Sequence, residues 1–169
     1  FSGTIDIAAS GITITEERKK KVDFCDPYYQ AGQGLLVRTE SSGIYKDLKS
    51  LEGKVVAVQI GTTGADLAKT IKGAEIKAFN TGAEAFMDLK MRGSEAVITD
   101  RPVIGYFMVK NPKAAKGLTL QKTRLDAEYF GFAVKKGNKA VATKVNDALR
   151  SMKSDGTYQK LYQKWFGIQ

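Results

Sequence analysis

The chain has 169 residues, of which 43% are apolar and 27% are charged, a composition typical of a folded chain with one domain or two small lobes. It contains no histidine and one cysteine, Cys25, which excludes a Ser-His-Asp triad, a Cys-His pair, a histidine metal site and an intramolecular disulfide. The formal net charge is +9, but the lysines are spread along the chain and no aromatic residue interrupts the basic run of residues 18–21, so we expect no nucleic-acid partner.

Short runs rich in Val, Ile and Phe, each bounded by turn residues, alternate with segments of helical spacing, which predicts an α/β fold. The expected strands cover residues 5–10, 34–38, 54–58, 75–79, 95–99 and 129–134. Residues 55–58 have no polar face, which is typical of a strand covered on both sides. Strand, helix and strand repeat over residues 54–109, so we expect this stretch to form a doubly wound lobe of successive βαβ units.

Several helix ends are also marked in the sequence. Thr81 followed by Glu84 is typical of a capping box, and Gly93 is expected to stop the same helix at its C′ position. Two amphipathic helices are expected at the end of the chain, after Asn138 and after Asp155. Their apolar positions are Val141, Val145, Ala148, Leu149 and Met152, and then Tyr158, Leu161, Tyr162, Trp165 and Phe166. Such stripes are typical of core packing, so we assign no ligand role to Trp165.

The extended segments 34–38 and 129–134 lie on either side of the βαβ block, as paired crossings between two lobes would. Only about thirty residues precede the first crossing and two helices follow the second, too few for an independent sheet-based lobe. We therefore expect one complete lobe and one partial lobe. The expected division is residues 1–33 as the remnant of the first lobe, 34–38 as the first hinge strand, 39–128 as the complete second lobe, 129–134 as the second hinge strand and 135–169 as the C-terminal helices of the first lobe.

Two predicted strand-to-helix turns carry glycines and hydroxyl groups. The first runs from Gly11 to Arg18, with Thr13 or Thr15 available as helix N-cap, and the second is Gly61-Thr62-Thr63-Gly64. Each turn alone is more typical of ordinary turn chemistry, although its backbone N–H groups can also accept an anion. Both turns follow predicted strands, and open α/β sheets bind ligands at the carboxyl ends of their strands. The phosphate-loop motif is absent, so we do not expect a nucleotide site.

Asp100 and Arg18 are candidates for binding the two charges of one ligand. Asp100 follows the predicted strand 95–99 and precedes Arg101-Pro102, so it is either a helix N-cap or the counter-charge of a ligand cation. Arg18 lies either on a solvated helix face or at a site where its planar guanidinium binds a carboxylate. With the two donor-rich turns, these charges complement a zwitterion.

Together these segments resemble the polar amino-acid-binding proteins of ABC importers, in particular the glutamine- and arginine-type members. The resemblance covers essentially the whole chain. It rests on the segment from Gly11 to Arg18, Val22-Asp23-Phe24-Cys25-Asp26-Pro27-Tyr28-Tyr29, Gly61-Thr62-Thr63, Asp100 followed by Pro102, Asp155-Gly156-Thr157-Tyr158 and Trp165-Phe166-Gly167. The family implies a type II periplasmic-binding-protein fold that closes on one amino acid between two lobes and delivers it to a membrane permease, with no catalysis, metal or cofactor.

The ligand-binding residues that the resemblance implies are Gly11, Thr13, Arg18, Gln59, Thr62, Thr63 and Asp100. Arg18 would bind the α-carboxylate, helped by main-chain groups of its turn and by the Thr13 hydroxyl. Asp100 would bind the α-ammonium group. The two threonines of the second turn would contact the carboxylate or the ligand side chain, and Gln59 falls where some relatives place a ligand-contacting lysine or another polar residue.

The chain departs from the family pattern at its start. Family members have a strand, an aromatic- and acid-bearing loop and further βα units before the position of Phe1, and Phe1-Ser2-Gly3 resembles a family motif that opens a helix, so we expect a truncated chain. Because the first lobe is incomplete, the apolar faces of the last helices are expected to form a homodimer. Cys25 stands where a small polar residue is usual and is expected to be buried and unreactive.

Two other functions remain open on the same fold. A cyclohexadienyl dehydratase-like enzyme would need a general acid, for which Glu128 or Asp126 could be proposed, although nothing in the sequence places either near Arg18. The ligand-sensing domain of a receptor is the other alternative. For the transport protein, the expected location is the periplasm or, as a lipoprotein, the cell surface, with a signal peptide outside this chain.

Overall fold

The computed structural model describes residues 4–166 and divides the chain into two compact units. Unit 1 comprises Phe1–Ala31 and Glu128–Gln169, and unit 2 comprises Gly32–Ala127. The motif Phe1-Ser2-Gly3 and the glycine of Trp165-Phe166-Gly167 lie outside the described residues. No helix of the described residues is long and apolar enough to cross a membrane.

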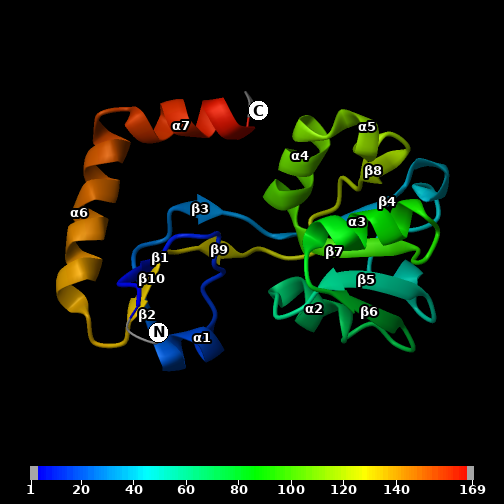
Figure 1. Cartoon of the computed structure of the whole chain (residues 1–169), viewed down its shortest axis with the longest axis horizontal. Coiled ribbons are helices and arrows are strands. Elements are labelled where there is room, and N and C mark those ends of the chain that lie inside the picture. The colour runs from blue at the N-terminus through cyan, green and yellow to red at the C-terminus, as the bar shows by residue number, and fades with distance from the viewer. Residues whose placement is uncertain (1–3, 167–169) are drawn as a thin grey trace. The chain divides into compact units, whose positions relative to one another are not determined.

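Unit 2 is built on a five-stranded sheet with the order β6-β5-β7-β4-β8 (Figure 1). Its strands are β4 (Gln33–Arg38), β5 (Val55–Gln59), β6 (Glu75–Phe79), β7 (Ala96–Asp100) and β8 (Leu118–Leu120). β5 runs parallel to both β6 and β7, whereas β4 runs antiparallel to both β7 and β8. The predicted doubly wound stretch is therefore present, and the segment expected as a first hinge strand is the fully buried β4 inside this sheet. Its action as a hinge stays a prediction.

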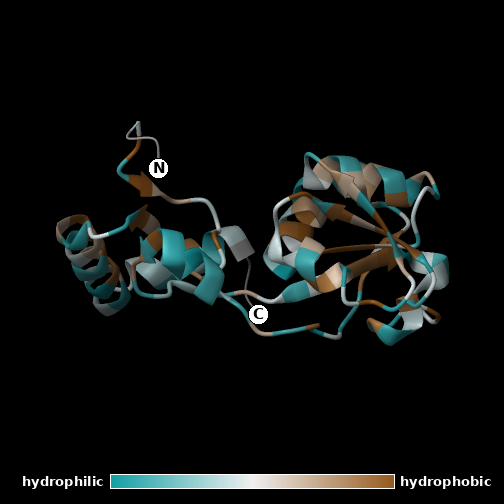
Figure 2. Ribbon diagram, turned by 90° about the horizontal axis from the view of Figure 1, so that it is seen from below, coloured by the Kyte–Doolittle hydropathy of each residue, from teal (hydrophilic) through white to brown (hydrophobic). Residues whose placement is uncertain are grey.

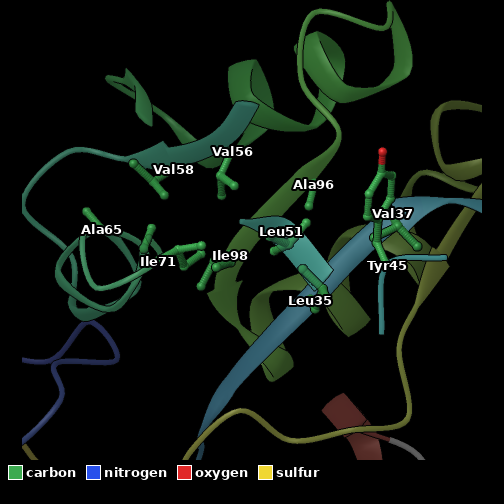
Figure 3. Packing of buried hydrophobic residues seen from close by; sticks show 11 residues of the cluster. Leu35, Val37, Tyr45, Leu51, Val56, Val58, Ala65, Ile71, Ala96 and Ile98 are labelled. Atoms are coloured by element: carbon green, nitrogen blue, oxygen red, sulfur yellow. The ribbon is translucent and has the colours of Figure 1, made fainter. Parts of the chain in front are cut away.

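Helices cover both faces of this sheet. They are α2 (Thr63–Ala68), α3 (Gly82–Lys90), α4 (Arg101–Lys110) and α5 (Pro112–Ala115), with short 3-10 helices at Thr39–Ser41 and Lys49–Leu51. Alternate residues of a strand point to opposite faces of the sheet, and each face carries its own hydrophobic cluster. On one face Leu35, Val56 and Ile98 pack with α2. On the other face Leu36, Ala57 and Val97 pack with α3 and α4. Figure 3 shows the first cluster, and Figure 2 shows strands inside unit 2 in brown, the colour of hydrophobic residues. The prediction that residues 55–58 are covered on both sides is confirmed for Val56, Ala57 and Val58.

The predicted capping box of α3 is confirmed, but the predicted stop is wrong. The Thr81 hydroxyl accepts from the Glu84 N–H at 3.3 Å, and the Glu84 carboxylate accepts from the Thr81 N–H at 2.8 Å. The left-handed position after the helix is occupied by Arg92, with φ 65°, instead of Gly93. Gly93 follows it and donates to the Asp88 carbonyl at 2.9 Å, and a Cβ at Gly93 would overlap the Asp88 carboxylate. A side chain at this position would therefore require the Asp88 side chain to move.

Unit 1 contains two small antiparallel sheets, with the orders β1-β10-β2 and β3-β9. The strands are β1 (Ile7–Ala8), β2 (Val22–Phe24), β3 (Tyr29–Gln30), β9 (Tyr129–Phe130) and β10 (Ala133–Lys135). The helices are α1 (Glu16–Lys21), α6 (Lys139–Ser154) and α7 (Thr157–Phe166). The strand expected over residues 129–134 is broken at Gly131, where a Cβ would lie 2.8 Å from the Ile14 side chain. A hinge role for this segment also stays a prediction.

The two predicted amphipathic helices at the end of the chain are confirmed as α6 and α7. The Tyr158 hydroxyl donates to the Tyr28 carbonyl at 2.6 Å, and the Tyr162 ring stacks on Tyr29 with 5.9 Å between centroids. Trp165, expected in the core, is instead 48% exposed, and Leu161 is 41% exposed. The Tyr158 hydroxyl and the Tyr162 ring thus fix one side of α7, while Leu161 and Trp165 of the same helix are exposed.

Cys25 is buried, as predicted, with 2% of its surface exposed. Its N–H donates to the Phe132 carbonyl at 2.8 Å. Burial raises the pKa of the Cys25 thiol above its usual 9.0. Since the thiolate is the reactive form of cysteine, a raised pKa makes the thiol less reactive. Cys25 therefore packs as a small apolar residue of unit 1 and is not a nucleophile.

Candidate functional site

In unit 1, the end of the turn from Gly11 to Arg18 is fixed by a helix cap. Thr15 has extended backbone angles, and its hydroxyl accepts from the Arg18 N–H at 3.1 Å, so α1 begins at the next residue. This cap places Arg18 in the first turn of α1. From there the Arg18 Nη1 donates to the Thr13 carbonyl at 3.0 Å, which holds the guanidinium beside the turn.

Thr13 is the buried centre of this cluster. It is 4% exposed and forms a β-bridge with Phe130, and its hydroxyl donates to Glu128 Oε2 at 3.1 Å. Gly11 has φ 61°, at which a side chain would be strained, and a Cβ there would be in van der Waals contact with the Phe130 ring, at 3.4 Å. The structure therefore brings together three predicted site residues of unit 1, namely Gly11, Thr13 and Arg18, with Glu128 beside them.

The position of Glu128 could not be found from the sequence. The sequence offered this residue only as a candidate acid for an enzyme, with no reason to place it near Arg18. It reaches Thr13 because Tyr129 and Phe130 of β9 pair with Gln30 and Tyr29 of β3, about a hundred residues earlier in the chain. Such long-range pairing leaves no local pattern, so no signal in the sequence could have located it.

In unit 2, the predicted residues lie at the ends of neighbouring parallel strands. β5 ends at Gln59 and β7 ends at Asp100, and because these strands are parallel their carboxyl ends share one edge of the sheet. Thr62 caps α2: its hydroxyl accepts from the Ala65 N–H at 3.1 Å and donates to the Gln59 carbonyl at 2.8 Å. The Thr62 hydroxyl thus shapes the turn itself. The Gln59 side chain donates to the Asn80 carbonyl at 3.2 Å.

Gln33, which the sequence reading placed only at a lobe boundary, connects the other two residues. Its Nε2 donates to the Thr63 hydroxyl at 3.0 Å and to the Asp100 carboxylate at 2.8 Å. The side chain is 1% exposed and lies against Gly64, where a Cβ would be 2.7 Å from Gln33 Oε1. Asp100 occupies the N-cap position of α4, but its side chain makes no capping hydrogen bond. Its carboxylate is oriented by Gln33 instead, so the alternative role as a side-chain cap is not observed.

Comparison with known proteins gives one family over nearly the whole chain. The model of the bacterial extracellular solute-binding proteins, family 3, matches residues 2–168. The ABC transporter glutamine-binding protein GlnH of Bacillus subtilis is 38% identical over 169 residues, covering 97% of this chain and 59% of that protein. The ABC transporter arginine-binding protein 1 of Escherichia coli is 34% identical, covering 95% of this chain and 66% of its own length. The chain thus spans about three fifths of such relatives.

Two similar solved structures are those of ancestral proteins. An ancestral arginine-binding protein bound to glutamine is 44% identical with a TM-score of 0.89, covering 99% of this chain and 73% of that chain. The ancestral amino acid-binding protein AncCDT-1, a precursor of cyclohexadienyl dehydratase, is 42% identical with a TM-score of 0.88, covering 98% and 70%. The same scaffold is therefore found with amino-acid ligands and in the ancestry of an enzyme.

Proposed function

Because the chain belongs to the bacterial extracellular solute-binding proteins, family 3, we propose that it is the solute-binding component of an ABC transporter for a polar L-amino acid. Glutamine is the first candidate ligand, and arginine or another basic amino acid is the second. The resemblance and the type II periplasmic-binding-protein fold expected from the sequence are confirmed. Membership of this family indicates an extracellular location. A periplasmic protein or a cell-surface lipoprotein is the more specific proposal.

The observation that carries the proposal is a pair of opposite charges, each oriented by a hydrogen bond within its own unit. Arg18 is held by the Thr13 carbonyl, and Asp100 is held by Gln33. We assign the ligand α-carboxylate to Arg18, with Gly11 and Thr13 of the same turn, and the α-ammonium group to Asp100. Oriented charges cost little further entropy when a zwitterion binds, which favours binding of such a ligand.

The remaining candidate residues lie beside Asp100 in unit 2. Thr63 shares the Gln33 amide with Asp100, and the N–H groups at the start of α2 lie next to it. Thr62 and Thr63 are proposed to contact the ligand carboxylate or side chain. Gln59 is proposed as a further polar contact, because its backbone is tied to Thr62 at the end of β5.

Binding is tested by titrating the chain with glutamine, arginine, lysine and histidine while NMR shifts and calorimetric heats are recorded. Arg18→Ala and Asp100→Asn should each leave one ligand charge unpaired and weaken binding by about 2 kcal/mol or more, which is roughly thirtyfold. Arg150→Ala is the matched control, since its side chain is 63% exposed on α6 and pairs with Asp147 and Asp26. Affinities unchanged in both site variants would contradict the assignment.

A second candidate function, a dehydratase or lyase, is favoured by one observation. Glu128 accepts from Thr13, whose carbonyl binds Arg18, so a carboxylate does lie close to the proposed carboxylate site. The similarity to AncCDT-1 adds to this alternative. Incubating the chain with prephenate- or arogenate-like acids and analysing the products decides between the enzyme and the binding protein. If the wild-type chain forms product and Glu128→Gln does not, the proposal that this chain is an enzyme replaces the proposal that it is a binding protein.

The proposed partners are the amino acid, an ABC permease in the membrane and a second copy of the chain. The second copy would use the exposed apolar side of α7, where Leu161 and Trp165 are 41% and 48% exposed. Light scattering should then give a dimer that Trp165→Lys reduces to a monomer, with Tyr106→Lys on α4 as the exposed aromatic control. A strict monomer at high concentration would exclude this dimer.

A further inference from the structure

Two arginines of unit 2, Arg101 and Arg124, lie close together at the start of β4. The Arg101 side chain lies across Gly34, because a Cβ at this glycine would be 2.9 Å from Arg101 Cγ. The Arg124 side chain lies across Gly32 in the same way, and a Cβ there would be 2.8 Å from Arg124 Cδ. Only one residue separates the two glycines, so the arginine side chains cross the backbone at neighbouring positions.

The Arg101 guanidinium is held in place by main-chain carbonyl groups. Its Nη1 donates to the Gln121 carbonyl at 2.7 Å and to the Thr123 carbonyl at 3.1 Å. Both of these bonds use Nη1, so the N–H groups of Nε and Nη2 can donate to another acceptor. Arg124 follows Thr123 directly and is exposed, so a ligand can reach its guanidinium from solvent.

The two positive charges are close enough to repel each other. Burial, and after it the charge of Arg124, lower the pKa of Arg101. Neither arginine forms an ion pair with a carboxylate of the described residues. The carboxylates nearest to them in the sequence, Asp100 and Asp126, each accept a hydrogen bond from Gln33. An anion that contacts both guanidinium groups would replace this repulsion by attraction.

The surrounding sequence and the geometry of arginine indicate which anion fits best. Residues 101–125 contain six lysines and arginines and no aspartate or glutamate, so this stretch attracts anions. A planar guanidinium can donate two parallel hydrogen bonds to one oxyanion. A phosphate group has more acceptor oxygens than a carboxylate and carries up to two negative charges, so it matches two guanidinium groups.

We propose that Arg101 and Arg124 form a binding site for a phosphate group on unit 2. The inference goes beyond the proposed function, because neither arginine is among its ligand contacts and every residue of the site belongs to one unit. Inorganic phosphate and the headgroup of an anionic phospholipid present the same phosphate oxygens. The experiment therefore has one arm for each source.

In the first arm, inorganic phosphate is added at constant ionic strength while backbone and arginine Nε–H signals are recorded by NMR. Arg124→Gln removes one guanidinium at an exposed position. Arg92→Gln is the matched control, because it changes the net charge equally and its side chain is 72% exposed in unit 2. In the second arm, the same three chains are sedimented with phosphatidylcholine vesicles prepared with and without phosphatidylglycerol.

We expect saturable shifts at Arg101, Thr123 and Arg124 with a Kd for phosphate of about 1–10 mM. The Kd should rise about tenfold or more in Arg124→Gln and stay unchanged in Arg92→Gln. Should Arg124→Gln fail to fold, Arg101→Lys keeps the charge but loses the planar pair of donors, and it must raise the same Kd.

The vesicle arm identifies the source of the phosphate group. Phosphate-induced shifts together with sedimentation on phosphatidylglycerol vesicles that Arg124→Gln lowers support the proposal with a lipid headgroup as ligand. Phosphate-induced shifts without such sedimentation support it with a soluble phosphate as ligand. A wild-type chain with no saturable shift up to about 100 mM phosphate, or equal weakening in Arg124→Gln and Arg92→Gln, overturns the inference.

Discussion

Gln33 is the side chain on which the arrangement of the unit 2 site most depends, and replacing it by leucine tests this directly. The wild-type amide donates to both Thr63 and Asp100 from a position that is 1% exposed. Leucine has a similar volume, but it donates no hydrogen bond. Gln33→Leu therefore removes two donors while leaving the space filled.

The expected loss of stability follows from the two hydrogen bonds. The bond to the Asp100 carboxylate involves a charged acceptor and contributes about 1.5–3 kcal/mol, and the bond to the Thr63 hydroxyl contributes about 1 kcal/mol. Better burial of leucine offsets part of this sum. We expect a net destabilisation of unit 2 of about 2–3 kcal/mol. Binding of the ligand ammonium group should weaken as well, because Asp100 loses the group that orients it.

The measurement is urea unfolding followed by circular dichroism, together with amide hydrogen exchange in β4 and β7. Trp165 lies in unit 1, so its fluorescence is not used to follow unit 2. Gln59→Leu is the control, since that side chain makes only the 3.2 Å bond to the Asn80 carbonyl at the surface and should cost less than about 1 kcal/mol. Equal stabilities of Gln33→Leu and wild type would refute the view that Gln33 holds Asp100 in place.

Two further predictions concern packing and pH. Gly64→Ala should destabilise unit 2 by more than about 1 kcal/mol in the same unfolding assay, because the new Cβ would lie 2.7 Å from Gln33 Oε1 and 2.9 Å from the Ile98 carbonyl. Gly43 has open space around it, so Gly43→Ala should leave the stability nearly unchanged. Hydrogen bonds from Lys136 and the Gly137 backbone hold the pKa of Asp23 below its usual 3.8, so their stabilising effect is present above that value and is lost as the pH falls through the lower pKa of the folded state. Lys136→Met should raise the pKa of Asp23 toward 3.8 in a carboxyl ¹³C NMR titration, and an unchanged pKa would show that Lys136 is not its cause.

The features that the sequence predicted well are those determined by neighbouring residues. The strand over residues 75–79 is found with the same bounds, and the Thr81 and Glu84 capping box forms as expected, because both depend on local spacing. The errors have non-local causes. The strand expected over residues 129–134 is divided because β9 pairs with β3 whereas β10 pairs with β1 and β2. The exposure of Trp165 depends on which surface of α7 finds a partner.

The candidate site shows the same division. Arg18 and Asp100 became candidates through their places after predicted strands, since the carboxyl ends of strands are recognisable in a sequence, and their ligand roles stay predictions. Gln33 and Glu128 were missed as parts of the site, because their hydrogen bonds join residues 67 and 115 positions apart along the chain. Burial of a polar side chain against a distant strand leaves no periodic pattern to read.

Unit 2 is one continuous stretch of chain inserted into unit 1, and the two ends of the insert are adjacent. The Gln33 N–H donates to the Asp126 carboxylate at 2.7 Å on the unit 2 side, and the Ala31 N–H donates to the Glu128 carbonyl at 2.8 Å on the unit 1 side. An insert with such neighbouring ends can be excised or exchanged without stretching its host. Unit 2 can therefore be exchanged as a whole between relatives, or expressed alone. When it is removed, a short turn between residues 31 and 128 can rejoin the two strands of unit 1.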